Sequence, residues 1–163
     1  SSSSPKAQCY QCTMVLKNSG SKELIDLQLV VKDVYFIGSN NRQKKISKLP
    51  EVILYWNNKQ DMKKITLREK ETKEIIISRI YPAAIEGTPD NKKQSPLRFS
   101  LTGVNLDSSY SNNGKWKVLY SLQTPHKIIK NILVEFTWTG RWCDRITEMS
   151  SEVGAKIIKE ESI

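Results

Sequence analysis

The feature that most constrains the fold is the two-residue spacing of apolar side chains in short runs. In "KWKVLYSL", Trp116, Val118 and Tyr120 fall on every second position. In "ILVEFTW", Val134 and Phe136 continue the same spacing. Successive side chains of a β-strand point to opposite faces, so this spacing gives each strand one apolar face. From Tyr10 onward the pattern therefore predicts strands.

The runs and the breaks between them predict an all-β chain. A short helix is expected near 144–153, followed by a final strand or a frayed end. A helix competes at 61–77, where the charged residues favour helices, but the isoleucine run favours strands. The seven to nine strands predict a two-layer β-sandwich. The expected strands are 10–18, 23–36, 51–56, 64–68, 72–80, 97–106, 115–122 and 128–138, and the expected long loops are 38–50 and 82–96.

The first predicted hairpin resembles a common opening of immunoglobulin-like sandwiches. The segment 18–20 (Asn-Ser-Gly) supplies a turn, and Leu27, Leu29 and Val31 then lie on one face of the next strand. Similar openings occur in many adhesive, appendage and accessory domains. The resemblance implies an immunoglobulin-like sandwich, and no functional residue follows from it.

Length and charge narrow the class of protein. The 163 residues fit one domain at 9–163, preceded by a flexible serine-rich leader at 1–8. The 26 Lys and Arg against 17 Asp and Glu give a net charge of +9, which favours acidic partners. No apolar run approaches the roughly 18 residues that span a bilayer. The leader suits a secreted or surface-tethered protein, although an arbitrary chain boundary explains it equally well.

Much of the excess positive charge lies in one segment. Between Asn41 and Lys73, ten Lys and Arg residues stand against four acidic ones. On one face they would form an anion-binding patch for an acidic protein or a nucleic acid. Alternatively, they only keep a β protein soluble and protect its edge strands. Aromatic residues for base stacking are scarce, which favours a protein partner. The candidate patch residues are Arg42, Lys44, Lys45, Lys48, Lys63 and Lys64.

The segment "VEFTWTGRWC" holds two tryptophans with different expected roles. Trp138 shares a face with Val134 and Phe136, so we expect it in the core. After Gly140 the alternation can reset through a bend. Trp142 with Arg141 is a candidate aromatic rim for a sugar or a protein. The competing interpretation is a half-buried Trp142 that covers one end of the sandwich.

The three cysteines, Cys9, Cys12 and Cys143, are candidates for a disulfide or a metal site. Cys143 with Cys9 or Cys12 is a candidate disulfide, and three reduced thiols are the alternative. A zinc site of the three cysteines and His126 is disfavoured, because no second CxxC accompanies the first.

Sequence motifs for catalysis are few. His126 is the one histidine, and phosphate-binding loops, HExxH sites and EF-hand loops do not occur. We therefore expect no enzyme, cofactor or metal. The sequence favours a non-catalytic module that binds a protein partner with an acidic face, as an accessory or assembly subunit. The alternatives are a carbohydrate-binding domain and a basic domain that binds nucleic acid or an anionic surface.

Overall fold

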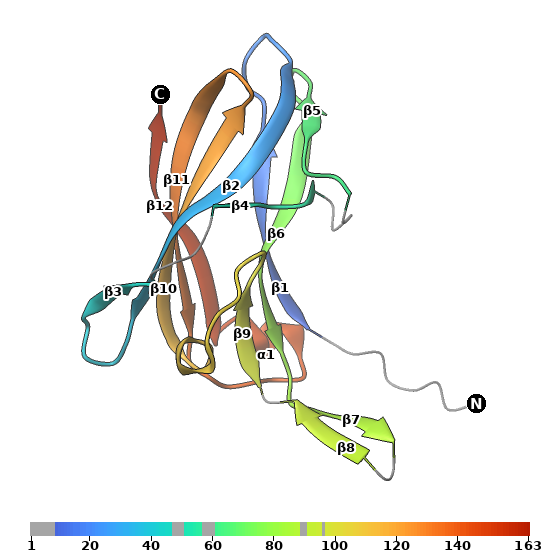
Figure 1. Ribbon diagram of the computed structural model, residues 1–163, viewed down its shortest axis with the longest axis vertical. Coiled ribbons are helices and arrows are strands. Elements are labelled where there is room, and N and C mark those ends of the chain that lie inside the picture. The colour runs from blue at the N-terminus through green and yellow to red at the C-terminus, as the bar shows by residue number, and fades with distance from the viewer. Residues whose placement is uncertain (1–8, 47–50, 57–60, 89–90, 96) are drawn as a thin grey trace.

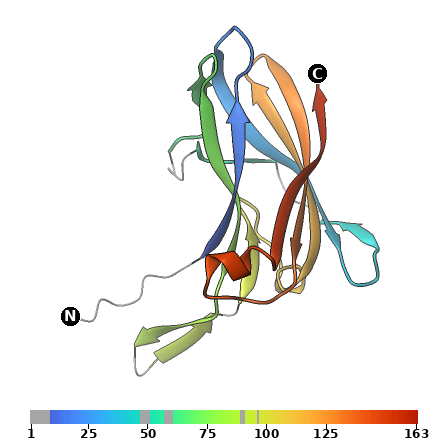
Figure 2. The same ribbon diagram turned by 180° about the vertical axis from the view of Figure 1, so that it is seen from behind.

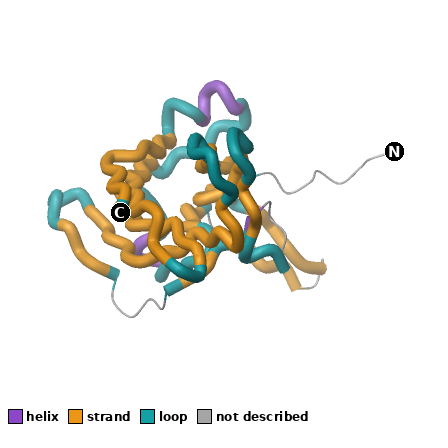
Figure 3. The backbone as a smooth tube through the Cα atoms, turned by 90° about the horizontal axis from the view of Figure 1, so that it is seen from above, coloured by secondary structure: helices purple, strands orange, loops and turns teal. Residues whose placement is uncertain are grey.

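Two antiparallel sheets pack face to face in the computed structural model of the chain (Figure 1). The structure describes residues 9–46, 51–56, 61–88, 91–95 and 97–163. Strands make up most of the described backbone, with helical turns only between them (Figure 3). The predicted two-layer β-sandwich is confirmed.

The smaller sheet has the strand order β1–β6–β9, and the larger has the order β12–β11–β10–β2–β3, with β4 and β5 also paired to β2. The smaller sheet is formed by β1 (Tyr10–Lys17), β6 (Thr72–Tyr81) and β9 (Arg98–Leu101). The larger sheet is formed by β2 (Leu24–Ile37), β3 (Gln43–Lys45), β4 (Val52–Ile53), β5 (Ile65–Leu67), β10 (Gly114–Thr124), β11 (Lys127–Trp138) and β12 (Val153–Ser162).

The turn between β1 and β2 is held by the side chain of Asn18. Its amide nitrogen donates hydrogen bonds to the carbonyl oxygens of Lys22 at 2.8 Å and Leu67 at 3.0 Å. Its oxygen accepts from the backbone N–H of Gly20 at 3.0 Å. One buried asparagine therefore forms the predicted turn and ties it to β5, and local hydrogen bonding of this kind explains the preference of asparagine for turns.

Two segments predicted as loops contain strands. Within 38–50, β3 pairs with Tyr35–Ile37 of β2, while 47–50 lie outside the described residues. Within 82–96, β7 (Ala84–Thr88) and β8 (Asn91–Ser95) form a separate hairpin that projects from the sandwich (Figure 1). Neither β3 nor β8 has alternating apolar residues, so backbone pairing forms them without a signal in the pattern. The strands in these two segments, β3, β7 and β8, are the ones beyond the predicted seven to nine.

Most of the other predicted strands agree closely with the structure, but the strand predicted at 97–106 shortens to β9 (Arg98–Leu101). The competing helix at 61–77 is wrong, because this segment contains β5 and the start of β6. The predicted strand at 51–56 shortens to β4, and Trp56 beyond it is buried with its indole N–H bonded to the carbonyl oxygens of Leu27 and Lys63, each at 3.1 Å. The short helix is α1 (Ile146–Met149), and the last strand is β12. No helix among the described residues is long and apolar enough to cross a membrane.

Aromatic rings join the two sheets in the core. Phe99 of β9 stacks on Trp116 of β10 with ring centroids 3.9 Å apart, and Phe136 of β11 lies 5.9 Å from Phe99. Trp138 is 3% exposed, and its indole N–H donates to the carbonyl oxygen of Arg141 at 3.0 Å. The alternation in β10 and β11 therefore identifies the core face correctly.

One side of the sandwich is open between the outer strands of the two sheets. β1 and β12 face each other there (Figure 2), and together with β6 and β11 they line a shallow apolar groove of about 350 Å³. Val15 and Ile157 are about half exposed at this groove. A β-bulge interrupts the pairing of β12 with β11 between Leu133 and Val134.

Replacing Trp138 by alanine should lower the free energy of unfolding by about 3 to 5 kcal/mol, because a large buried ring is lost from the core. Trp142 is only half-buried, so Trp142→Ala should cost clearly less. Urea denaturation followed by circular dichroism measures both. Equal losses would show that the two rings are equally important to the core.

Candidate functional site

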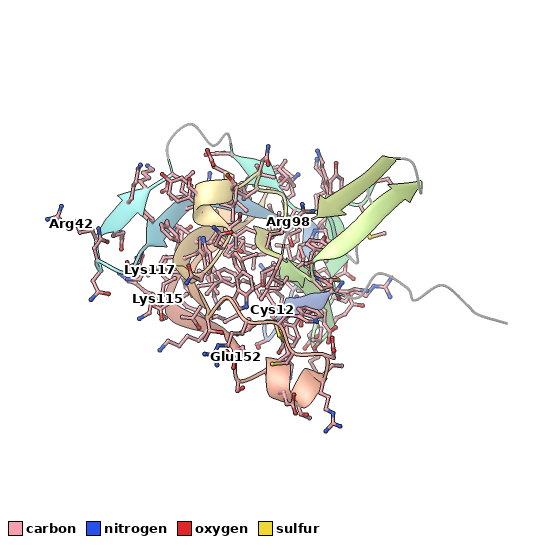
Figure 4. The ribbon with its side chains drawn as sticks, turned by 90° about the horizontal axis from the view of Figure 1, so that it is seen from below. Cys12, Arg42, Arg98, Lys115, Lys117 and Glu152 are labelled. Carbon is pink, nitrogen blue, oxygen red and sulfur yellow. The ribbon has the colours of Figure 1, made fainter. Side chains whose placement is uncertain are left out.

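The outer face of the larger sheet carries the most distinctive arrangement of charge. Along β10, Trp116 and Val118 point into the core and are fully buried, so Lys115 and Lys117 point outward. Figure 4 shows Lys115 and Lys117 beside each other, on the same side of the molecule as Arg42. Leu119 continues the outward row and is half-buried.

Strand pairing extends this face in both directions. Lys117 pairs with Tyr35 of β2 and with Glu135 of β11, and Glu135 pairs with Lys156 of β12. Leu119 lies in the next row with Leu133 and Lys159. We call the residues Lys45, Lys115, Lys117, Lys156 and Lys159 the lysine face.

An apolar floor lies within the lysine face. Tyr35, Leu119 and Leu133 are half-buried and line a depression of about 380 Å³, together with Lys117 and Lys159. Lys115 lines a second, larger depression of about 650 Å³ at the end of this face where β10 begins. Protein interfaces commonly combine an apolar centre with a polar, solvent-accessible rim, and the floor with its surrounding charges has this arrangement.

The lysines of this face differ in their electrostatic partners. Lys45 lies 3.0 Å from the Asp33 carboxylate, whose hydrogen bond and negative charge raise the pKa of the ammonium group. Lys159 lies 2.9 Å from Glu161. Lys115, Lys117 and Lys156 have no ion pair or side-chain hydrogen bond with any described residue. Three cations of the lysine face are therefore free to bind an anion.

The structure separates the residues of the predicted basic patch. Lys44 pairs with Phe36, and Ile65, next to Lys64, pairs with Leu27 nine residues earlier on β2. At about 3.3 Å per residue, these positions lie about 30 Å apart. Lys63 and Lys64 are thus far from β3, and Lys48 lies outside the described residues.

The β3 residues also divide between two faces. Lys45 points to the outer face, whereas Lys44 lies 5.5 Å from the ring of Tyr110 on the other side. The side chain of Tyr110 raises the pKa of Lys44. Arg42 is exposed in the β2–β3 connection (Figure 4).

The predicted aromatic rim is partly covered. Trp142 is half-buried, and its indole N–H donates to the Asp144 carboxylate at 3.0 Å. Arg141 is exposed, and its backbone carbonyl holds Trp138. This agrees with the interpretation of Trp142 as a cover for one end of the sandwich. None of the ring pairs found among the described residues includes Trp142.

The predicted disulfide is wrong for this structure, in which Cys9, Cys12 and Cys143 are all unpaired. Cys12 faces the core, where burial raises the pKa of its thiol despite a hydrogen bond with Ser78. Cys9 and Cys143 line one depression with Trp142 and Met149.

Other chemistry is sparse in the part of the chain that the structure describes. His126 is exposed in the turn between β10 and β11. No group of three or more His, Cys, Asp and Glu side chains that could hold a metal ion occurs among the described residues. No family model, curated protein or solved structure matches this chain.

Most of the lysine face was not among the sequence candidates. Only Lys45 was, whereas the residues from β10 and β12 and the tyrosine of the floor were not. A usable signal existed, since Lys115 and Lys117 flank Trp116, a position assigned to the core. The contribution of β12 had no local signal, because it depends on pairing with β11.

Cys12 in the native protein should react with iodoacetamide more slowly than in the urea-denatured protein. A raised pKa leaves less thiolate at about pH 8, and burial limits access. Peptide mapping without reduction, after brief alkylation, measures this and should also find Cys143 unlinked. A peptide cross-linked through Cys143 would contradict the unpaired state, and equal rates at Cys12 would contradict its burial.

Proposed function

We propose that this β-sandwich is a non-catalytic interaction module that binds an acidic protein partner on its lysine face. One observation carries the proposal: Lys115, Lys117 and Lys156 share the outer face of one sheet, and none of them forms an ion pair with a described residue, although Glu135 lies between Lys117 and Lys156. Unpaired cations on a rigid sheet attract anionic groups and hold them without rearrangement of the backbone.

The apolar floor favours a protein over a nucleic acid. Tyr35, Leu119 and Leu133 offer a small area that aliphatic or aromatic side chains can cover. A surface for single-stranded nucleic acid stacks successive bases on several aromatic rings. Tyr35 is the one aromatic residue lining this depression. A polynucleotide therefore finds charge on this face but little stacking.

The position of β10 suits an accessory or assembly role. It pairs with β2 on one side and β11 on the other, so Lys115 and Lys117 lie on a central strand that is held along most of its length, whereas Lys156 lies on the outer strand β12. A partner would meet a preformed surface, which limits the entropy lost on binding. The single histidine lies exposed in the turn after β10, away from the lysines in sequence and in the strand register.

Replacing Lys115, Lys117 and Lys156 together by glutamine should abolish most partner binding. Exposed ion pairs contribute about 0.2 to 1 kcal/mol each, so the loss of three should weaken the affinity roughly 3-fold to 140-fold. Affinity capture from the native source at about 150 mM salt, with quantitative mass spectrometry, measures the loss.

The matched control replaces Lys63, Lys64 and Lys70 by glutamine. These lysines are exposed near the opposite end of β2, and the control removes the same amount of charge. It should leave capture unchanged. Equal loss in both variants would show that net charge, and not the lysine face, determines binding. Sub-micromolar, salt-sensitive binding to a DNA or RNA oligomer would favour the nucleic-acid alternative instead.

A further inference from the structure

The outward residues of β10 form a regular row. Lys115, Lys117 and Leu119 are spaced two residues apart on one strand, and each pairs with one residue of β2 and one of β11. Alternate residues of an antiparallel strand are spaced about 6.8 Å apart. Along β10, two lysines are thus followed, at the same spacing of about 6.8 Å, by Leu119 of the apolar floor.

The face is also defined across the strands. Lys156 lies in the row of Lys117 with Glu135 between them, which places the two lysines about 10 Å apart across β11. In the next row Lys159 is already paired with Glu161 at 2.9 Å, beside Leu133. The free positive charge therefore ends where the apolar floor begins.

We infer that the partner presents an extended segment that lies along β10, with acidic residues at two alternate positions and an apolar residue two positions further on. The inference rests on the proposed function and specifies its ligand. An extended chain has the same 6.8 Å repeat as β10, so each acidic side chain meets one lysine. The apolar side chain then covers Tyr35, Leu119 and Leu133 in the depression of about 380 Å³.

Charge complementarity selects this ligand. Lys117 is half-buried and forms no ion pair with Glu135 opposite it or with any other described residue, so a carboxylate of the partner at this position gains a charge-assisted hydrogen bond. A uniform polyanion would satisfy the lysines equally well. It would, however, place charge over the apolar floor next to Glu161 and Asp33, where a neutral side chain is better accommodated.

Three labelled synthetic peptides of equal length test the inference by fluorescence anisotropy with the full chain. The first has aspartates at two alternate positions and a phenylalanine two positions on. The second has the same composition with aspartates and phenylalanine spaced four apart, as on one face of a helix. The third has serine in place of the phenylalanine. We expect the first peptide to bind at least 5-fold more tightly than either of the others.

Variants of the chain locate the contacts. Lys117→Gln should weaken binding of the first peptide several-fold and should also weaken binding of the third. Leu119→Thr should weaken binding of the first peptide only. Thermal unfolding of this variant shows whether it is folded. Amide chemical-shift changes in the unaltered protein should concentrate on β10 and its neighbours, and this measurement needs no substitution. Lys64→Gln is the control and should change none of these affinities.

Several results would overturn the inference. Equal affinity for all three peptides would show that charge alone binds. Tighter binding of the second peptide would assign a helical partner, and tighter binding of an oligonucleotide than of any peptide would assign a polyanion. If no peptide binds while partner capture still depends on the lysines, the extended segment is wrong and the proposed function stands. If capture does not depend on them, the proposed function fails by itself.

Discussion

The stack of Phe99 on Trp116 is the contact on which the rest of the arrangement depends. Its ring centroids are 3.9 Å apart, and its two residues come from different sheets, so it joins the two layers. Removing a buried ring of this size costs about 3 to 5 kcal/mol, a large part of the stability of a typical domain. The same contact sets the orientation of β10. A shift of one residue would turn Trp116 to solvent and bury Lys115 and Lys117, and the large energetic cost excludes it.

The long strands could be predicted from the sequence because the order of apolar and polar residues along them matches their burial pattern. In β10 and β11 an apolar residue points inward at every second position over most of the strand, and β6 contains a run of isoleucines. The strands that were missed are formed in another way. β3 has the sequence QKK and is fully exposed, so it exists through hydrogen bonds to β2 and not through burial. A short polar strand of this kind has the composition of a loop.

The candidate site was less predictable because strand order, and not sequence distance, decides which charges meet. The basic residues at 42–45 and 63–64 lie in one segment of the chain, yet they border opposite ends of β2. Lys117 and Lys156 are distant in sequence and lie in one row through Glu135. A count of charges along the chain therefore detects the excess of lysine, but it groups lysines that lie far apart in the folded sheet.

The position of each lysine in its sheet bears on whether it solubilises the protein or binds a partner. Lys156 and Lys159 lie on β12, the outer strand of the larger sheet, which also has a bulge. Charges and bulges on an outer strand prevent pairing with another chain, so Lys156 and Lys159 protect this edge in addition to the contact proposed for Lys156. Lys115 and Lys117 lie on β10, which is paired on both sides and has no open edge to protect.

Solubility is also a weak explanation for Lys117. Its side chain is half-buried beside Tyr35 and Leu119, and it forms no ion pair with Glu135, the carboxylate directly opposite it on β11. A lysine that only kept the protein soluble would do so better at a fully exposed position. An aliphatic stem packed beside the apolar floor, with an ammonium group that forms no ion pair, is the arrangement that the proposed acidic partner would complete.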